Sequence, residues 1–546
     1  MSSHRDRYRE IAETLSRHGM GLIVDLAGLE QLVPFHRGLL GHERRAEPYT
    51  RPEHVRLALE QLGTTFIKLG QVLSTRPDLV GEAYATELAK LRDSAPAVPP
   101  SDVLEAVASE LGSSVREAFR SFDREPLAAA SIGQAHAAVL HDGTEVVVKV
   151  RRPGVVEQVE QDIEILHNLA ARAQHRWEGA ARYDLVGLAG EFALTLRAEL
   201  DYLQEARSAE RFAAAFRGDH GVHIPRVFWQ TTTSRVLTLE RMRGTNVADV
   251  AALDAAGIDR PLLAERATRV VAQMVFDDGF FHADPHPGNF FIERDGTIGL
   301  IDFGLVGEVD AELRDRLGAL LVGLASEDAD RITTAVLRLT IARGPVSRTR
   351  LRADLERLVR SYSGQAIGDL PLGALIREVL GILRRNDLQL PAELALLIKT
   401  VVMLEGLGAR LDPDFRFGEV LAPYAQRFVA RMLSPAAVIR RLQATGLDVA
   451  QLGLEFPEHL RRLLDLLEND GLQVRLSPDE LRELASQLRR REDRLAAAVV
   501  VAALVQPIVD LALAARNGER PRTRPLLAAG VTAAVVTYLL RSARSP

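Results

Sequence analysis

A short loop and the tripeptide that follows it constrain this chain more than any other part of its sequence. The loop has the pattern H-x-D-x-x-x-x-N, with Asp284 and Asn289 five positions apart. Two prolines and a glycine restrict its backbone, which suits a rigid loop that presents two polar side chains to one point. Thirteen residues after Asn289, an apolar strand ends in D-F-G and adds the carboxylate of Asp302. Magnesium prefers carboxylate and amide oxygens, so Asn289 and Asp302 are candidate metal ligands.

Two other interpretations of this loop stay open. His282, Asp284 and His286 offer a zinc site, although no fourth ligand stands out. The second alternative is a plain polar loop without a site. The tripeptide D-F-G does not by itself exclude this alternative, because it occurs by chance in many chains. The order of the two motifs, with a turn predicted at 294–296 between them, favours a shared site.

A lysine on a predicted strand adds a cation. Residues 145–150 are mostly apolar and β-branched, and Asp142-Gly143 precedes them, which predicts a hairpin. Lys149 lies in this strand, where a buried amine is costly unless it is paired. The alternative is a lysine that extends to solvent at a strand edge. Only four of the 68 basic residues are lysines, and this rarity favours a specific use of a compact ammonium at Lys68 and Lys149.

These residue types match the needs of phosphoryl transfer. That reaction requires a cation on the phosphates, oxygen ligands for magnesium and a carboxylate that orients the nucleophile. Lys149, Asp284, Asn289 and Asp302 supply these groups in the order of the protein-kinase motifs. Taken together, the four residues favour a phosphoryl-transfer site over the alternatives.

Further motifs narrow the resemblance. Residues 66–71 contain K-x-G-Q, residues 128–134 an alanine-rich loop, and residues 199–201 E-x-D. With Leu404-Glu405-Gly406 and Leu411-Asp412-Pro413, they resemble the UbiB/ADCK (AarF-like) family of atypical protein-kinase-like proteins over roughly residues 45–430. Ordinary protein kinases have neither K-x-G-Q nor the alanine loop.

The resemblance implies a role for each matching residue. Glu205 would pair with Lys149, and together they would position the phosphates of ATP or ADP. Asp284 would be the catalytic carboxylate, and Asn289 and Asp302 would hold Mg²⁺. The remaining implied site residues are the gating pair Lys68 and Gln71, the E-x-D residue Glu199, the phosphate loop Ala128, Ala129, Ala130 and Ser131, and the adenine-binding hinge around Glu240 and Met242.

Two of these assignments have structural alternatives. The residues Ala128–Ala130 restrict the conformations that a glycine-rich loop would reach, so the grip on phosphate should differ from that of a protein kinase. The alternative is an alanine-rich strand. Lys68 lies on an amphipathic segment, and the alternative there is a solvated helix face on which Gly70 marks close helix packing.

The fold class predicted is α+β, a protein-kinase-like two-lobed fold with a helical N-terminal extension and C-terminal apolar membrane helices. Helices are expected at 102–111, 155–176 and 184–216, and strands at 223–229, 235–241, 290–292 and 298–301. The expected domains are a helical extension at 1–110, an N-lobe at 111–243, a C-lobe at 244–430, a helical region at 431–494 and a membrane hairpin at 495–541.

The membrane hairpin rests on two apolar runs. Residues 495–515 contain only Gln506 and Asp510 as polar members and would form a helix about 31 Å long, enough to span a bilayer. The second run, 525–540, is shorter, and a pair of buried or partner-packed helices is the alternative. The resemblance implies membrane association, with the kinase-like domain on the cytoplasmic side of a bacterial inner membrane. It also implies membrane lipids, quinone-pathway lipids or enzymes as partners, and a homodimer is one option.

Composition excludes several other classes. A net charge of −6 gives no basic field for nucleic acid, and the absence of cysteine excludes disulfides and thiolate sites. No A-P-E or long activation segment follows D-F-G, which favours a small-molecule or lipid acceptor, or ATP hydrolysis. The function predicted is an atypical kinase or ATPase that supports isoprenoid-quinone (ubiquinone-type) biosynthesis or membrane lipid homeostasis. The alternatives are a catalytically silent nucleotide-sensing membrane scaffold and an antibiotic-type small-molecule kinase.

Overall fold

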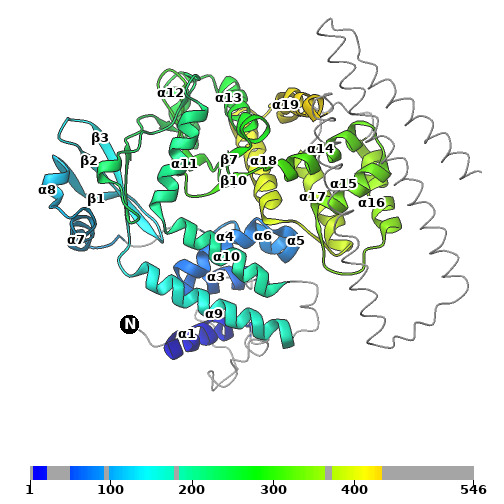
Figure 1. Ribbon diagram of the computed structural model, residues 1–546, viewed down its shortest axis with the longest axis horizontal. Coiled ribbons are helices and arrows are strands. Elements are labelled where there is room, and N and C mark those ends of the chain that lie inside the picture. Colours follow the sequence, from blue (N-terminus) through cyan, green and yellow to red (C-terminus); the bar gives the residue numbers. More distant parts are fainter. Residues whose placement is uncertain (1–3, 21–49, 92–96, 177–183, 363–371, 433–546) are drawn as a thin grey trace, which may run out of the picture. The chain divides into compact units, whose positions relative to one another are not determined.

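The computed structural model describes residues 4–20, 50–91, 97–176, 184–362 and 372–432 (Figure 1). The chain divides into two units, Met1–Val429 and Ala430–Pro546, and nearly all of the described residues belong to the first. No helix within the described ranges is both long and apolar enough to cross a bilayer. The membrane hairpin expected at 495–541 lies outside these ranges, as does most of the helical region expected at 431–494.

The described residues of the N-terminal extension are mainly helical, as the periodicity predicted. Its helices are α1 (His4–Arg17), α3 (Arg51–Leu62), α4 (Thr64–Ser74), α5 (Pro77–Val80) and α6 (Glu82–Leu88). Thr50 and Glu53 form a capping box that starts α3, and Gly63, at a φ of 87°, separates α3 from α4. Leu59, Phe66 and Leu88 form a core with Ile165 of α9 (Val155–Arg176). This packing fixes α4, which carries K-x-G-Q.

An antiparallel sheet follows the helices α7 (Pro100–Leu111) and α8 (Val115–Ala118). Its strands are β1 (Ser121–Ala129), β2 (Gly133–Val139), β3 (Glu145–Arg151) and β5 (Val236–Glu240), in the order β1-β2-β3-β5. The turn between β2 and β3 contains Gly143 at a φ of 90°, so the predicted hairpin is confirmed. Alternate valines of β3 are buried, which leaves Lys149 on the opposite face.

Two predicted elements are wrong in detail. The single helix expected at 184–216 is two helices, α10 (Leu185–Glu199) and α11 (Tyr202–Ala215), because Asp201 caps the second. The strand expected at 223–229 is only β4 (Val222–His223), which pairs in parallel with β9 (Ile298–Leu300) in another sheet. Pro225 lacks an N–H group and cannot continue a ladder.

The remaining described residues are mainly helical and contain the short strands that carry the loop motifs. β7 (Phe280–His282) pairs with β10 (Val306–Glu308), and β8 (Phe290–Ile292) forms a hairpin with β9. The two-residue strands are β6 (Thr245–Asn246), β11 (Ile341–Ala342) and β12 (Leu388–Gln389). The helices are α12 (Val250–Ala255), α13 (Arg260–Gln273), α14 (Ala311–Ala325), α15 (Ala329–Leu339), α16 (Arg348–Tyr362), α17 (Leu372–Arg385), α18 (Ala392–Leu411) and α19 (Phe417–Met432). One hydrophobic core joins α11, α13, α18 and the strands β7 to β9.

Candidate active site

The strand lysine and the helix glutamate form a close pair. Lys149 Nζ lies 2.5 Å from Glu205 Oε1 and 3.7 Å from Asp302 Oδ2. Burial disfavours the ammonium, but the two carboxylates outweigh it and raise the pKa of Lys149. Burial likewise raises the pKa of Glu205, against the opposing effect of Lys149. Lys149 is therefore a permanent cation that faces the cleft.

The E-x-D segment explains how this pair is positioned. α10 ends at Glu199, and the side chain of Asp201 accepts a hydrogen bond from Leu203 N at 3.0 Å. Such an N-cap starts a new helix, so α11 begins at Tyr202 and Glu205 lies within its first turn. Glu199 meets Lys68 of α4, with Oε2 and Nζ 2.8 Å apart. Because the chain breaks between α10 and α11, Glu199 pairs with Lys68 and Glu205 pairs with Lys149.

In the D-F-G segment, the phenylalanine is buried in the core, whereas the aspartate lines the cavity. Phe303 is 1% exposed, and its ring centroid lies 5.5 Å from that of Phe212 on α11. Phe303 N donates to Glu205 Oε1 at 3.2 Å, which links this segment to the Lys149 pair. Asp302 has a φ of 65°, a strained conformation for a residue with a side chain and one that is concentrated at functional sites. Lys149 lowers the pKa of Asp302, which keeps its carboxylate ionised.

The loop between β7 and β8 is braced by a buried histidine. His282 Nδ1 accepts from Asp284 N at 3.2 Å, and Nε2 lies 3.4 Å from Ile301 O, which assigns the ring proton to Nε2. Burial lowers the pKa of His282, so the ring is neutral. Both of its nitrogens face backbone groups, and among the described residues no three histidine, aspartate or glutamate side chains form a metal-binding cluster. The zinc alternative therefore gains no support.

The candidate magnesium ligands are compatible with a hard cation. Asn289 Nδ2 donates to Asp284 O at 3.0 Å, so its amide nitrogen is engaged and its oxygen remains for a cation. Asp302 adds an ionised carboxylate with a half-exposed side chain. Oxygen donors of these two kinds fit Mg²⁺.

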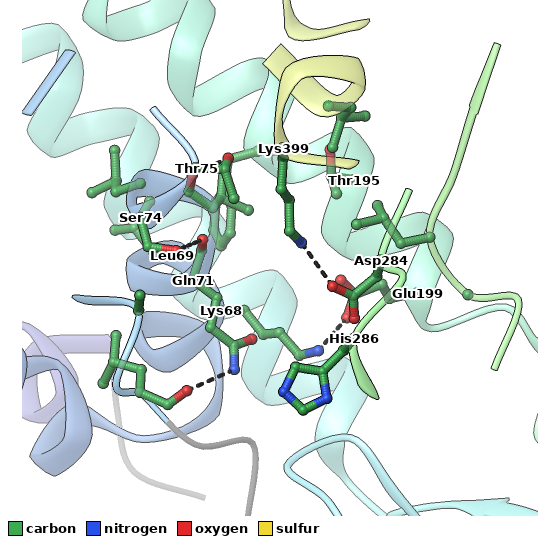
Figure 2. Close-up of a pocket in the computed structure, with 18 of the residues that line it drawn as sticks. Lys68, Leu69, Gln71, Ser74, Thr75, Thr195, Glu199, Asp284, His286 and Lys399 are labelled. Atoms are coloured by element: carbon green, nitrogen blue, oxygen red, sulfur yellow. Dashed lines mark hydrogen bonds and ion pairs between the residues drawn. The ribbon is translucent and has the colours of Figure 1, made fainter. Parts of the chain in front are cut away.

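The sequence prediction missed one lysine of this site. Lys399 of α18 lies with Nζ 2.9 Å from Asp284 Oδ1 (Figure 2). It comes from a helix 115 positions further along the chain, so no local motif announces it. The sequence signal for Lys399 is the scarcity of lysine, which singled out Lys68 and Lys149 only together with the motifs around them.

Lys68, Leu69 and Gln71 of the K-x-G-Q motif line the same cavity (Figure 2). Gln71 Nε2 donates to Leu91 O at 3.3 Å, and Gly70 is buried against Leu59, Leu88 and Leu91. Close helix packing at Gly70, first considered as an alternative to function, is therefore present together with the Lys68–Glu199 pair.

The alanine segment is partly a strand. Ala128 and Ala129 end β1 and pair with β2, and only Ala128 and Ala130 of the four predicted residues line the cavity. Ala130 N donates to Gly133 O at 2.8 Å, which removes one N–H group that a phosphate would use. Ser131 is buried, and its carbonyl accepts from Thr64 Oγ1 at the start of α4.

The predicted hinge borders the same cavity. Glu240 and Met242 both line the cavity. The N–H groups of Glu240 and Arg241 already donate to the carbonyls of Arg226 and Glu145. The backbone groups that remain for adenine are therefore the N–H group of Met242 and the carbonyl oxygens of this segment.

A single cavity of about 2260 Å³ connects these groups. It contains Lys68, Lys149, Asp284, Asn289 and Asp302, and it continues along apolar side chains. Among these apolar side chains are Leu15, Leu73, Leu169, Leu188, Ile376 and Leu396. The arrangement combines a cationic and acidic centre with a large apolar annex.

Comparisons with known proteins find family models and relatives that match this chain. The ABC1 atypical kinase-like domain matches residues 90–336, and the UbiB helical domain matches residues 355–416. A probable protein kinase UbiB of Azotobacter vinelandii is 35% identical over 77% of this chain and 80% of its own. Another, of Pseudomonas entomophila, is 34% identical over 93% of both chains. Among solved structures, the complex of Rv3197 with erythromycin from Mycobacterium tuberculosis is 28% identical, with a TM-score of 0.47, over 65% of this chain and 90% of that chain.

Proposed function

Because this chain belongs to the ABC1/UbiB family of atypical kinase-like proteins, we propose that it binds magnesium-ATP or ADP and transfers or hydrolyses the terminal phosphate. The observation that carries the proposal is the convergence of Lys149, Asp284, Asn289 and Asp302 on one cavity. Phosphoryl transfer requires a cation, a carboxylate and oxygen ligands of these kinds.

Each residue has a role that follows from its surroundings. Lys149, held by Glu205, contacts the phosphates as a fixed cation. Magnesium held by Asn289 and Asp302 would neutralise charge on the phosphate oxygens. Asp284 orients the attacking hydroxyl group, of water or of an acceptor, and takes its proton as the new P–O bond forms. The bond to ADP breaks, and ADP leaves with its electron pair.

The apolar annex supports a small-molecule or lipid acceptor. The cavity exceeds the roughly 300–1,000 Å³ of ordinary small-molecule pockets, and much of the excess is lined by aliphatic side chains. The chain also reaches β10 two residues after Gly304 and α14 soon afterwards, which leaves little room for a peptide platform. Together with the UbiB relatives, this favours a role in isoprenoid-quinone biosynthesis or lipid homeostasis at a membrane, with 495–541 as the anchor.

The test is ATP hydrolysis by the full-length chain, with and without anionic lipid vesicles. We expect turnover that EDTA abolishes and that Asp302→Asn lowers by at least about 100-fold. Asp295→Asn is the matched control, because Asp295 is exposed and accepts a turn hydrogen bond from Thr297 N, which asparagine also accepts. Nucleotide binding without turnover in every condition would contradict the proposal and fit a nucleotide-sensing scaffold.

A further inference from the structure

The catalytic-loop segment 282–289 contains no lysine or arginine, so a lysine or arginine beside Asp284 must come from another element. Lys399 supplies it, with Nζ 2.9 Å from Asp284 Oδ1. Among the described residues, the structure gives Asp284 Oδ2 no hydrogen-bond partner. One carboxylate oxygen is therefore held and the other is available to a substrate.

The helix that carries Lys399 is fixed at both ends. Before its start, the buried pair Arg76 and Asp78 binds Leu390, through Arg76 Nη2 to the carbonyl at 2.9 Å and Asp78 Oδ2 to the N–H at 3.4 Å. At its end, Arg260 Nη1 donates to Leu411 O at 2.7 Å. Lys399 lies in the middle of α18, so its stem projects from a rigid support, which is how a precise contact is maintained.

Stability alone is a poor explanation for this pair. The side chains of Lys399 and Asp284 are 19% and 38% exposed, and pairs at such positions contribute about 1 kcal/mol or less. Elsewhere this chain uses arginine for most of its ion pairs. Three of the four lysines instead pair with carboxylates of the cavity: Lys68 with Glu199, Lys149 with Glu205, and Lys399 with Asp284.

We propose that Lys399 is a positioning residue for the phosphoryl-transfer reaction. It holds Asp284 Oδ1, so that Oδ2 points to the attacking hydroxyl group and receives its proton. The inference rests on the proposed function, and it gives the helical region at 355–416 a part in a reaction whose proposed phosphate, magnesium and proton-accepting residues lie within 90–336. The two family regions would thus form one active site.

The experiment measures kcat and KM for MgATP hydrolysis in the full chain. We expect Lys399→Met to lower kcat by about 10- to 100-fold and to change the KM for ATP by less than about threefold. Lys399→Arg should recover part of the loss, because arginine also holds a carboxylate. Arg410→Met is the control on the same helix. In the part of the chain that the structure describes, the side chain of Arg410 donates to Ala248 O and does not line the cavity, so the variant should leave kcat unchanged.

A double-mutant cycle separates positioning from a structural effect. If Lys399 acts through Asp284, adding Lys399→Met to Asp284→Asn should lower the residual turnover no further. A Lys399→Met enzyme with wild-type kcat, or losses that multiply in the double variant, would overturn the inference while the proposed function stands. A wild-type chain that binds nucleotide and never turns it over would overturn the proposed function, and the role of Lys399 with it.

Discussion

The two sides of the cleft differ in how the chain builds them. On one side, Lys149 of β3, Glu205 of α11 and Asp302 form a cluster within the kinase-like region. On the other, Asp284 and Glu199 receive their lysines from α18 and α4 (Figure 2). The first side uses motifs that phosphoryl transfer requires in any kinase-like fold. The second side depends on how the N-terminal extension and the helical region pack. This side can therefore differ from that of other kinase-like proteins in the phosphate acceptor it binds and in how its activity is regulated.

The largest effect should follow from breaking the first side. Lys149→Met leaves Glu205, which is 6% exposed, with the N–H of Phe303 as its one remaining hydrogen-bond donor among the described residues. Removing one member of a buried pair costs about 3 kcal/mol of unfolding free energy, and we expect turnover to fall by at least about 100-fold. Urea unfolding and ATP hydrolysis measure the two effects.

Lys90→Met is the stability control for this prediction. Lys90 also pairs with a glutamate, Glu87, but its side chain is 60% exposed, so its removal should cost less than about 1 kcal/mol. Equal losses of unfolding free energy in Lys149→Met and Lys90→Met would contradict the claim that burial makes the Lys149 pair the more costly one to break.

The second side should be sensitive to helix packing. A Cβ atom at Gly70 would overlap Leu91 and lie 2.8 Å from Leu59 Cδ1, so in Gly70→Ala these packed leucine side chains, or α4 itself, must shift. We expect a loss of about 1–3 kcal/mol, measured by urea unfolding. Gly406→Ala in α18 is the matched control. A Cβ atom there meets nothing within 4 Å, and alanine should stabilise the helix by about 0.5–1 kcal/mol. Stabilisation by Gly70→Ala would show that α4 is not tightly packed.

A smaller, pH-dependent effect should appear where the hinge meets the loop after β8. His223 Nδ1 lies 2.5 Å from Glu293 Oε1, and Nε2 lies 3.4 Å from Glu240 Oε2. Burial lowers the pKa of His223, but the two carboxylates raise it further than burial lowers it. The imidazolium therefore stabilises the fold fully below the unfolded pKa of about 6.5, and this contribution is lost as pH rises through the folded value.

The expected size is about 1 kcal/mol or less, because the three side chains are about one-third exposed and screened by solvent. Thermal unfolding between pH 5.5 and 9 should show this loss in the wild type, and His223→Gln should remove it. An identical pH dependence in both proteins would exclude His223 as its source.

Local patterns predicted most of the first side. The hairpin at Asp142-Gly143, the helix α9 and the strands around the two loop motifs are confirmed, because turn residues and hydrophobic periodicity act over short distances. The break at Asp201 was missed because the apolar pattern continues through it, although aspartate is a preferred N-cap residue. Lys399 was missed because its contact spans 115 positions and depends on tertiary packing that no local pattern encodes.

The most direct test compares nucleotide binding and turnover in the wild type and in Asp284→Asn. If Asp284 takes the proton from the attacking hydroxyl group, the variant should bind MgATP within about threefold of the wild-type Kd and hydrolyse it at least about 100-fold more slowly. Equal turnover in the two proteins would contradict the assignment of Asp284, and binding without turnover in either would contradict the account of this chain as an enzyme.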